Sequence, residues 1–172
     1  MIKLNLKFIS CLLILLFSSC SDENKKPNVI IIYADDLGFG DVSAYNQGTL
    51  NTPNIDRIAN KGIKFTNGHS SSATCSPSRY ALLTGSYPWR NSKAKISTGA
   101  SMIIDVNQKT LPKMFKESNY STAIIGKWHL GLGDGQINYN SKISPGPNEV
   151  GFDYSYIMPD TQDRVPTVYI ED

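Results

Sequence analysis

Cys75 has the surroundings of a reactive group. It opens the stretch Cys-Ser-Pro-Ser-Arg, residues 75–79, at the expected start of a helix. The chain has three cysteines, and Cys11 and Cys20 belong to an N-terminal signal, so no internal disulfide is available to Cys75. A helix N-terminus favours anions, and Arg79 lies one turn further on. These residue types fit a nucleophile; a small buried hydrophobe near a surface arginine is the alternative.

Lys127 and His129 form a second candidate pair, within Gly-Lys-Trp-His-Leu-Gly, residues 126–131. In an extended chain, residues two apart point to the same side. A cation and an imidazole facing one spot suit an anionic substrate that needs proton transfer. The alternatives are a solvated lysine and a histidine satisfied within its loop. Trp128 points the other way and is expected in the core, and the glycines permit close backbone approach.

Asp35 and Asp36 are adjacent carboxylates that follow an apolar run. Like charges this close are costly unless a cation lies beside them, and a hard ion such as Ca²⁺, or alternatively Mg²⁺, prefers oxygen ligands. A solvated turn explains the pair equally simply. His69, the only other histidine of the two in the chain, falls in a loop and is expected to have no catalytic role.

Alternating element types predict an α/β fold with a mostly parallel central sheet sandwiched by helices. Polar clusters follow two of the expected strands, at the strand ends where ligands gather in such sheets. The expected elements are strands at 27–33, 63–66 and 120–125, and helices at 52–62, 78–83 and 110–117. Thr52, Pro53 and Gly62 mark the ends of the first helix, and Gly85 ends the second. If the Cys75 motif has no chemical role, Ser78 would be an ordinary cap of that second helix.

The N-terminus resembles a bacterial lipoprotein signal. A basic start and an apolar stretch at 8–17 precede Leu-Phe-Ser-Ser-Cys, residues 16–20. Residues 1–19 are expected to be a signal peptide, Cys20 the lipidated residue, and 20–26 a polar tether. The alternative is an ordinary signal that leaves Cys20 as a free thiol. The expected location is the outer membrane of a Gram-negative bacterium, on its periplasmic or cell-surface face.

Charge gives no reason to expect a nucleic-acid partner. The whole chain carries a formal charge of +2, with 17 basic and 15 acidic residues, and loss of Lys3 and Lys7 with the signal leaves the mature chain neutral. A neutral protein lacks the basic footprint that binding to phosphate backbones requires.

Taken together, the motifs resemble those of the type I sulfatases, the formylglycine-dependent branch of the alkaline phosphatase superfamily. Residues 75–79 match that family's Cys-x-Pro-Ser-Arg signature, and Ala-Leu-Leu-Thr-Gly at 81–85 continues it. The order and spacing agree over nearly the whole mature chain, so residues 27–172 resemble the N-terminal part of a sulfatase catalytic domain. The other matching stretches are 34–38, 52–56, 126–131 and 151–153.

The resemblance implies that a maturation enzyme oxidises Cys75 to formylglycine before export. One hydroxyl of the hydrated aldehyde would attack the sulfur of a sulfate ester, and the second would later expel sulfate. Arg79 would hold this diol, Lys127 would bridge it to a sulfate oxygen, and His129 would assist elimination. Asp35 and Asp36, with the modified Cys75, would bind Ca²⁺.

The expected activity is therefore removal of sulfate from a sulfated carbohydrate such as a glycosaminoglycan or an algal polysaccharide. The alternatives are a formylglycine-dependent phosphonate monoester or phosphodiester hydrolase, and a non-catalytic glycan-binding surface lipoprotein. Members of the family run to several hundred residues, so the fold is expected to be incomplete at the C-terminus, and these 172 residues alone to be inactive and poorly stable. Residues 86–105 are expected either to form part of the sugar-binding rim or to be an ordinary surface loop.

Overall fold

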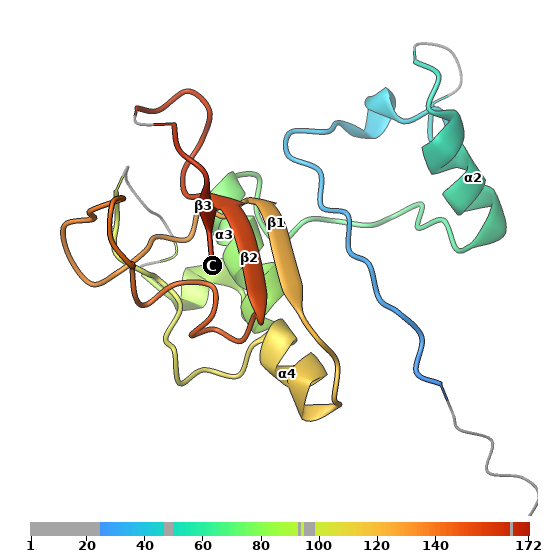
Figure 1. Cartoon of the computed structure of the whole chain (residues 1–172). Helices are drawn as coiled ribbons and strands as arrows, with labels where there is room; N and C mark the ends of the chain where they lie inside the picture. The colour runs from blue at the N-terminus through green and yellow to red at the C-terminus, as the bar shows by residue number, and fades with distance from the viewer. Residues whose placement is uncertain (1–24, 47–49, 93, 95–98, 166) are drawn as a thin grey trace, which may run out of the picture. The chain divides into compact units, whose positions relative to one another are not determined.

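A computed structural model describes residues 25–46, 50–92, 94, 99–165 and 167–172 (Figure 1). The chain divides into two units, residues 1–36 and 37–172. The described helices and strands all lie in the second unit. They are the 3-10 helices η1 (Phe39–Asp41) and η2 (Pro88–Arg90), the helices α2 (Pro53–Lys61), α3 (Cys75–Thr84) and α4 (Leu111–Glu117), and the strands β1 (Ala123–Lys127), β2 (Tyr154–Met158) and β3 (Ile170–Glu171).

Two of the three strand predictions are wrong, because those segments form no strand in this structure. Residues 27–33 form neither helix nor strand, and the side chains of Ile30 and Ile32 are each 83% exposed. Residues 63–66 likewise have no strand, and Ile63 and Phe65 are exposed. An apolar, β-branched run has the right residue types for a buried strand, but a strand also needs a neighbouring ladder, which residue types alone do not supply.

The third expected strand is present, displaced toward its carboxyl end. It was expected at 120–125 and forms as β1 at Ala123–Lys127. β1 pairs in parallel with β2, with Ile125 opposite Tyr156, and β2 pairs antiparallel with the short β3. The described sheet, in the order β1-β2-β3, is therefore mixed, with one parallel and one antiparallel pair.

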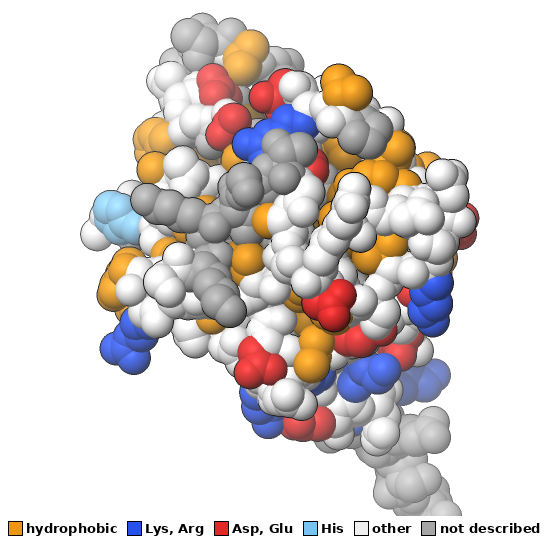
Figure 2. Space-filling model, turned by 90° about the vertical axis from the view of Figure 1, so that its left-hand side faces the viewer, with side chains coloured by type: hydrophobic (Ala, Val, Ile, Leu, Met, Phe, Trp, Pro, Cys, Tyr) orange, Lys and Arg blue, Asp and Glu red, His pale blue; other side chains and the backbone are white. Residues whose placement is uncertain are grey.

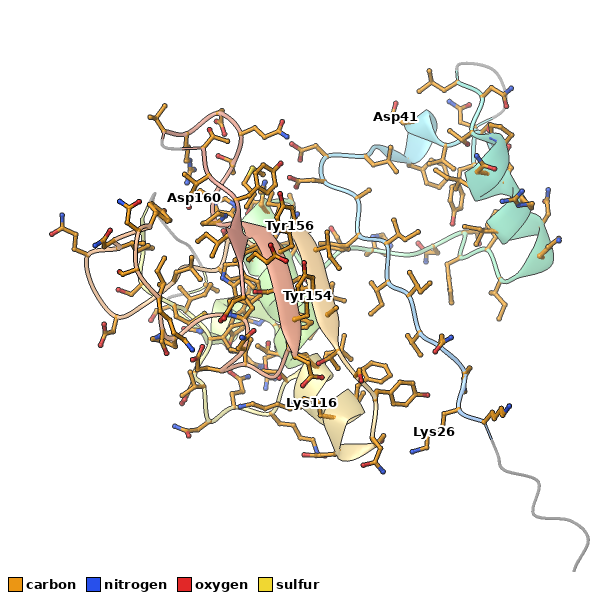
Figure 3. All side chains as sticks on the ribbon, viewed as in Figure 1. Lys26, Asp41, Lys116, Tyr154, Tyr156 and Asp160 are labelled. Atoms are coloured by element: carbon orange, nitrogen blue, oxygen red, sulfur yellow. The ribbon has the colours of Figure 1, made fainter. Side chains whose placement is uncertain are left out.

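The core of the second unit lies on one face of this sheet, where α3 packs (Figure 1). Burial alternates along β2, so Ile157 faces the core while Tyr154 and Tyr156 face outward (Figure 3). The expected core position of Trp128 is confirmed, because this side chain is 1% exposed. Its neighbours in the buried cluster are Tyr80, Leu83, Ala94, Ile103, Ile104, Leu130, Leu132, Val150, Phe152 and Ile157.

The helix ends follow local sequence signals closely. Thr52, Pro53 and Gly62 bound α2 as expected, although the Thr52 hydroxyl bonds to Ser43 and Asp56 rather than to the helix backbone. The Thr110 side chain caps α4 by accepting from the Lys113 N–H at 3.4 Å. These caps satisfy backbone or neighbouring polar groups that would otherwise lack partners.

Residues 151–153, Gly-Phe-Asp, tie α4 to the start of β1. The Asp153 carboxylate pairs with the Lys116 ammonium at 2.6 Å and accepts from the Thr122 N–H at 2.8 Å. Phe152 packs edge-on against Trp128, with ring centroids 6.5 Å apart. This stretch therefore supports the strand that carries Lys127.

Acidic and basic side chains are interspersed on the face drawn in Figure 2, rather than gathered by sign. Among the described residues, none of the helices has the length and apolar character needed to cross a membrane. The expected signal peptide and lipidated Cys20 lie outside the described residues.

Candidate active site

Cys75 is the first residue of α3, so the helix begins three residues earlier than the expected 78–83. Thr74, in an extended conformation, precedes it, and the Ser78 N–H donates to the Thr74 carbonyl at 3.2 Å. Ser78 is therefore not the cap; its buried hydroxyl donates to the Ser72 carbonyl at 2.7 Å instead. The half-buried Cys75 thus sits in the first turn, where helix N–H groups favour negative charge.

The other end of α3 is as expected. Gly85 has φ +65°, and its N–H donates to the Ala81 carbonyl at 2.9 Å. A left-handed conformation at this position suits glycine. The helix that presents Cys75 is thus ten residues long and closed at its C-terminus.

Lys127 brings a positive charge to Cys75. It is the last residue of β1, and its Nζ donates to the Cys75 Sγ across 3.2 Å. The two residues lie 52 positions apart, so the fold creates this contact. An ammonium at this distance stabilises negative charge on whichever atom occupies the Sγ position.

Arg79 fixes the strand end to the helix. Its Nη1 donates to the Lys127 carbonyl at 2.6 Å. The sequence predicted that Arg79 could reach back toward Cys75, whereas the bond seen here runs to the residue whose side chain contacts Cys75. Arg79 therefore links α3 to β1 and helps to set the position of Lys127.

His129 is buried, at 5% exposure, with a left-handed backbone of φ +53°. The backbone continues the pairing of β1 past its end, since the His129 N–H donates to the Pro159 carbonyl at 2.9 Å. Burial, reinforced by the nearby charges of Lys127 and Arg164, lowers the pKa of His129 from 6.5 to about 4, while Asp160 opposes the shift. The imidazole is consequently neutral at pH 7.

The glycines around Lys127 and His129 are there for conformational and steric reasons. Gly131 has φ +74°, and a Cβ built on it would lie 2.0 Å from the Ser101 carbonyl oxygen. The Trp128 indole N–H donates to the Gly131 carbonyl at 2.7 Å. The expectation of close backbone approach is therefore confirmed at Gly131.

Asp35 and Asp36 are exposed, and Asp36 has φ +56°. Their carboxylates have the hard oxygen chemistry that Ca²⁺ prefers, but Ca²⁺ takes six to eight oxygen ligands. Within residues 25–46, 50–92, 94, 99–165 and 167–172, no group of three or more His, Cys, Asp or Glu gathers around one point. The described residues therefore offer at most a partial site. His69 is exposed and contacts Asn67, at 2.9 Å from Nε2 to Oδ1.

Arg164 and Asp160 are two charged neighbours of His129 that the sequence did not indicate. The Arg164 Nη1 lies 3.4 Å from the His129 Nε2, and Asp160 lies just past the carboxyl end of β2 (Figure 3). The strand β2 was not anticipated from the sequence. Had the aromatic run at 154–158 been identified as a strand, the strand-end rule would have pointed to the residues that follow it.

A search against family models matches residues 27–170 to the sulfatase family. The chain belongs to the sulfatase family. An N-acetylgalactosamine-6-O-sulfatase of Bacteroides thetaiotaomicron is 49% identical over 150 residues, which cover 86% of this chain and 29% of that enzyme. Human steryl-sulfatase is 38% identical over 161 residues, covering 90% of this chain and 27% of that enzyme.

Solved sulfatase-like structures confirm the α/β, alkaline phosphatase-like class of the fold. One, titled for the metabolism of multiple glycosaminoglycans by Bacteroides thetaiotaomicron, superposes with a TM-score of 0.82 at 50% identity, covering 86% of this chain and 31% of that one. Another, Ps i-CgsB in complex with k-i-k-neocarrahexaose, superposes with a TM-score of 0.68 at 36% identity, covering 80% of this chain and 29% of that one. This sulfatase-family chain thus spans under a third of the relatives it matches.

Proposed function

We propose that the protein hydrolyses sulfate esters of a sulfated carbohydrate, with Cys75 matured to formylglycine. The observation that carries the proposal is the approach of the Lys127 ammonium to the Cys75 Sγ, 3.2 Å away, at the first turn of α3. A nucleophilic oxygen in place of Sγ would need cationic and N–H donors around it, and these two elements provide them. Membership of the sulfatase family supports the same assignment.

Formylglycine would supply a geminal diol, which provides both an attacking hydroxyl and a second hydroxyl for releasing sulfate. Lys127 would donate to the developing negative charge on this group and on a sulfate oxygen. Arg79, through its 2.6 Å bond to the Lys127 carbonyl, would keep that lysine in place and add positive charge near the nucleophile. His129, neutral at pH 7, would hydrogen-bond an oxygen during elimination.

Asp35 and Asp36 would supply part of the ligand set of a Ca²⁺ ion. Two adjacent carboxylates supply the correct ligand type but too few oxygens.

A sulfated polysaccharide is the substrate class that the relatives' names favour. One of them is an N-acetylgalactosamine-6-O-sulfatase, and one similar structure holds a neocarrahexaose. Export and lipidation at Cys20 would place the protein on the periplasmic or outer surface of a Gram-negative outer membrane, where a polymer substrate would be accessible. The protein's partners would then be the maturation enzyme, the membrane and the sulfated glycan.

The test uses the natural protein, isolated from its native host. It compares the protein's turnover of an aryl sulfate with its turnover of an aryl phosphate diester. The Cys75→Ala variant is the control for chemistry at this residue. We expect sulfate release to be faster than diester cleavage, and the variant to lose both. Faster diester cleavage would replace the proposal with a phosphoester hydrolase. Binding of sulfated glycan without any turnover would replace it with a binding protein.

A further inference from the structure

We propose that Arg164 is a positioning residue that fixes the proton of the His129 imidazole on Nδ1. This inference rests on the proposed function only for its catalytic consequence. The contact itself joins residues 35 positions apart, with Arg164 Nη1 3.4 Å from His129 Nε2. None of the roles inferred above for His129 assigns a purpose to this arginine.

The direction of the contact follows from the chemistry of the two groups. A guanidinium has five N–H donors, no acceptor, and stays charged in proteins. The bond between them can form only if Nε2 accepts through its lone pair. In a neutral imidazole the remaining proton must then reside on Nδ1.

The charge state of the ring agrees with this assignment. Burial and the flanking cations Lys127 and Arg164 keep the imidazole neutral at neutral pH, while Asp160 opposes them. A protonated ring would carry N–H groups at both nitrogens and would turn a donor toward the guanidinium. The neutral Nδ1–H form is the one in which both groups are compatible.

The Nδ1 atom is buried and has no hydrogen-bond partner within the described part of the chain. His129 as a whole is only 5% exposed. A buried donor without a partner is costly, and native proteins tolerate it mainly where a ligand or another functional group completes the bond. We assign that donor to an anionic oxygen of the substrate or of the matured nucleophile.

Arg164 is itself held by its backbone. Its N–H donates to the Thr161 carbonyl at 3.3 Å, and its carbonyl accepts from the Thr167 hydroxyl at 2.8 Å. These bonds define a turn directly after the carboxyl end of β2. A side chain extending from a fixed turn can impose an orientation on its partner with little further ordering.

The decisive measurement is the tautomer of His129, read from the nitrogen chemical shifts and long-range couplings of protein labelled with ¹⁵N-histidine. His69 is the only other histidine in these 172 residues, and its exposed ring provides an internal comparison. We expect Nδ1 to carry the proton in the unmodified sequence. The Arg164→Met variant keeps much of the side-chain volume but cannot donate, so its Nε2 signal should shift toward the protonated pattern.

Two further variants separate positioning from folding. Arg164→Lys restores a cationic donor and should recover the original tautomer at least partly. Arg90→Met removes an exposed arginine from η2 and should leave the His129 signals unchanged. A folded Arg164→Met protein that retains the Nδ1–H pattern would overturn the proposal, as would an Nε2–H pattern in the unmodified protein.

Because the tautomer is read without turnover, this outcome is independent of the proposed sulfatase activity. If that activity is present, Arg164→Met should lower kcat by ~10²-fold, the scale expected when a catalytic group loses its orientation, with a smaller effect on KM. If Arg164→Met loses the Nδ1–H tautomer of His129 and the parent protein has no sulfatase activity, Arg164 is supported as a positioning residue and the enzyme assignment is refuted.

Discussion

Gly131→Ala should destabilise the protein far more than a typical glycine substitution. The backbone at Gly131 has φ +74°, and the added Cβ would lie 2.0 Å from the Ser101 carbonyl oxygen and 2.5 Å from its carbon. Both neighbours are backbone atoms, so no side-chain rotation relieves the overlap. The Gly131 carbonyl also accepts the buried Trp128 indole N–H, which a backbone shift would weaken.

The magnitude has two parts. A non-glycine residue in the left-handed region costs roughly 1–2 kcal/mol, and forcing an extra carbon into a packed site costs typically ~1–3 kcal/mol. The expected loss is therefore about 2–5 kcal/mol. Gly85→Ala is the matched control, because Gly85 has φ +65° but a Cβ there would meet nothing within 4 Å. It should lose only the first part, about 1–2 kcal/mol.

The assay is urea unfolding followed by tryptophan fluorescence, which reports on the buried Trp128. Each variant's free energy of unfolding is compared with that of the parent chain under one set of conditions. Equal destabilisation of the protein by Gly131→Ala and Gly85→Ala would contradict this prediction. Equality would mean that the approach of the Ser101 carbonyl does not constrain the loop that follows His129.

Three other perturbations test the account. Lys127→Met should reduce sulfate release by ~10²–10³-fold, because it removes the cation at Cys75; Lys109→Met, at an exposed lysine, should not. Asp153→Asn should make the free energy of unfolding depend less on pH under acidic conditions. The Lys116 and Thr122 bonds depress the Asp153 pKa below 3.8, so the stability they give is complete above that pH and lost as pH falls through the lower, folded-state value. Urea titrations at several pH values measure this dependence, and an Asp153→Asn variant whose unfolding free energy varies with pH as steeply as that of the parent would contradict the prediction. Leu130→Ala should cost ~2–5 kcal/mol in the same unfolding assay, since Leu130 is fully buried; a loss under 1 kcal/mol would contradict its core position.

Local signals predicted the helix ends well. Gly62 and Gly85 ended their helices as expected, since a stop of this kind depends on a few consecutive residues. The start of α3 was placed three residues late. Its position depends on Thr74 and on the buried bond from Ser78 to the Ser72 carbonyl, which composition did not reveal.

Pairing across the chain could not be predicted in the same way. The run at 27–33 has strand composition, yet it pairs in no described ladder. The contact between Cys75 and Lys127 was anticipated only through family resemblance, because 52 residues separate them. Arg164 was missed because neither its neighbours nor its spacing distinguishes it from a surface arginine.

The central claim is that Cys75 is matured to formylglycine, and the most direct test is the mass of the tryptic peptide of residues 65–79. The peptide should come from protein purified from its native host, and it contains Cys75 as its only cysteine. We expect an aldehyde in place of the CH₂–SH group, detected as the corresponding mass loss and by reaction with a hydrazide. An intact thiol in the purified protein would contradict the claim, and the roles proposed for Lys127, Arg79 and His129 in sulfate transfer would then have to be withdrawn.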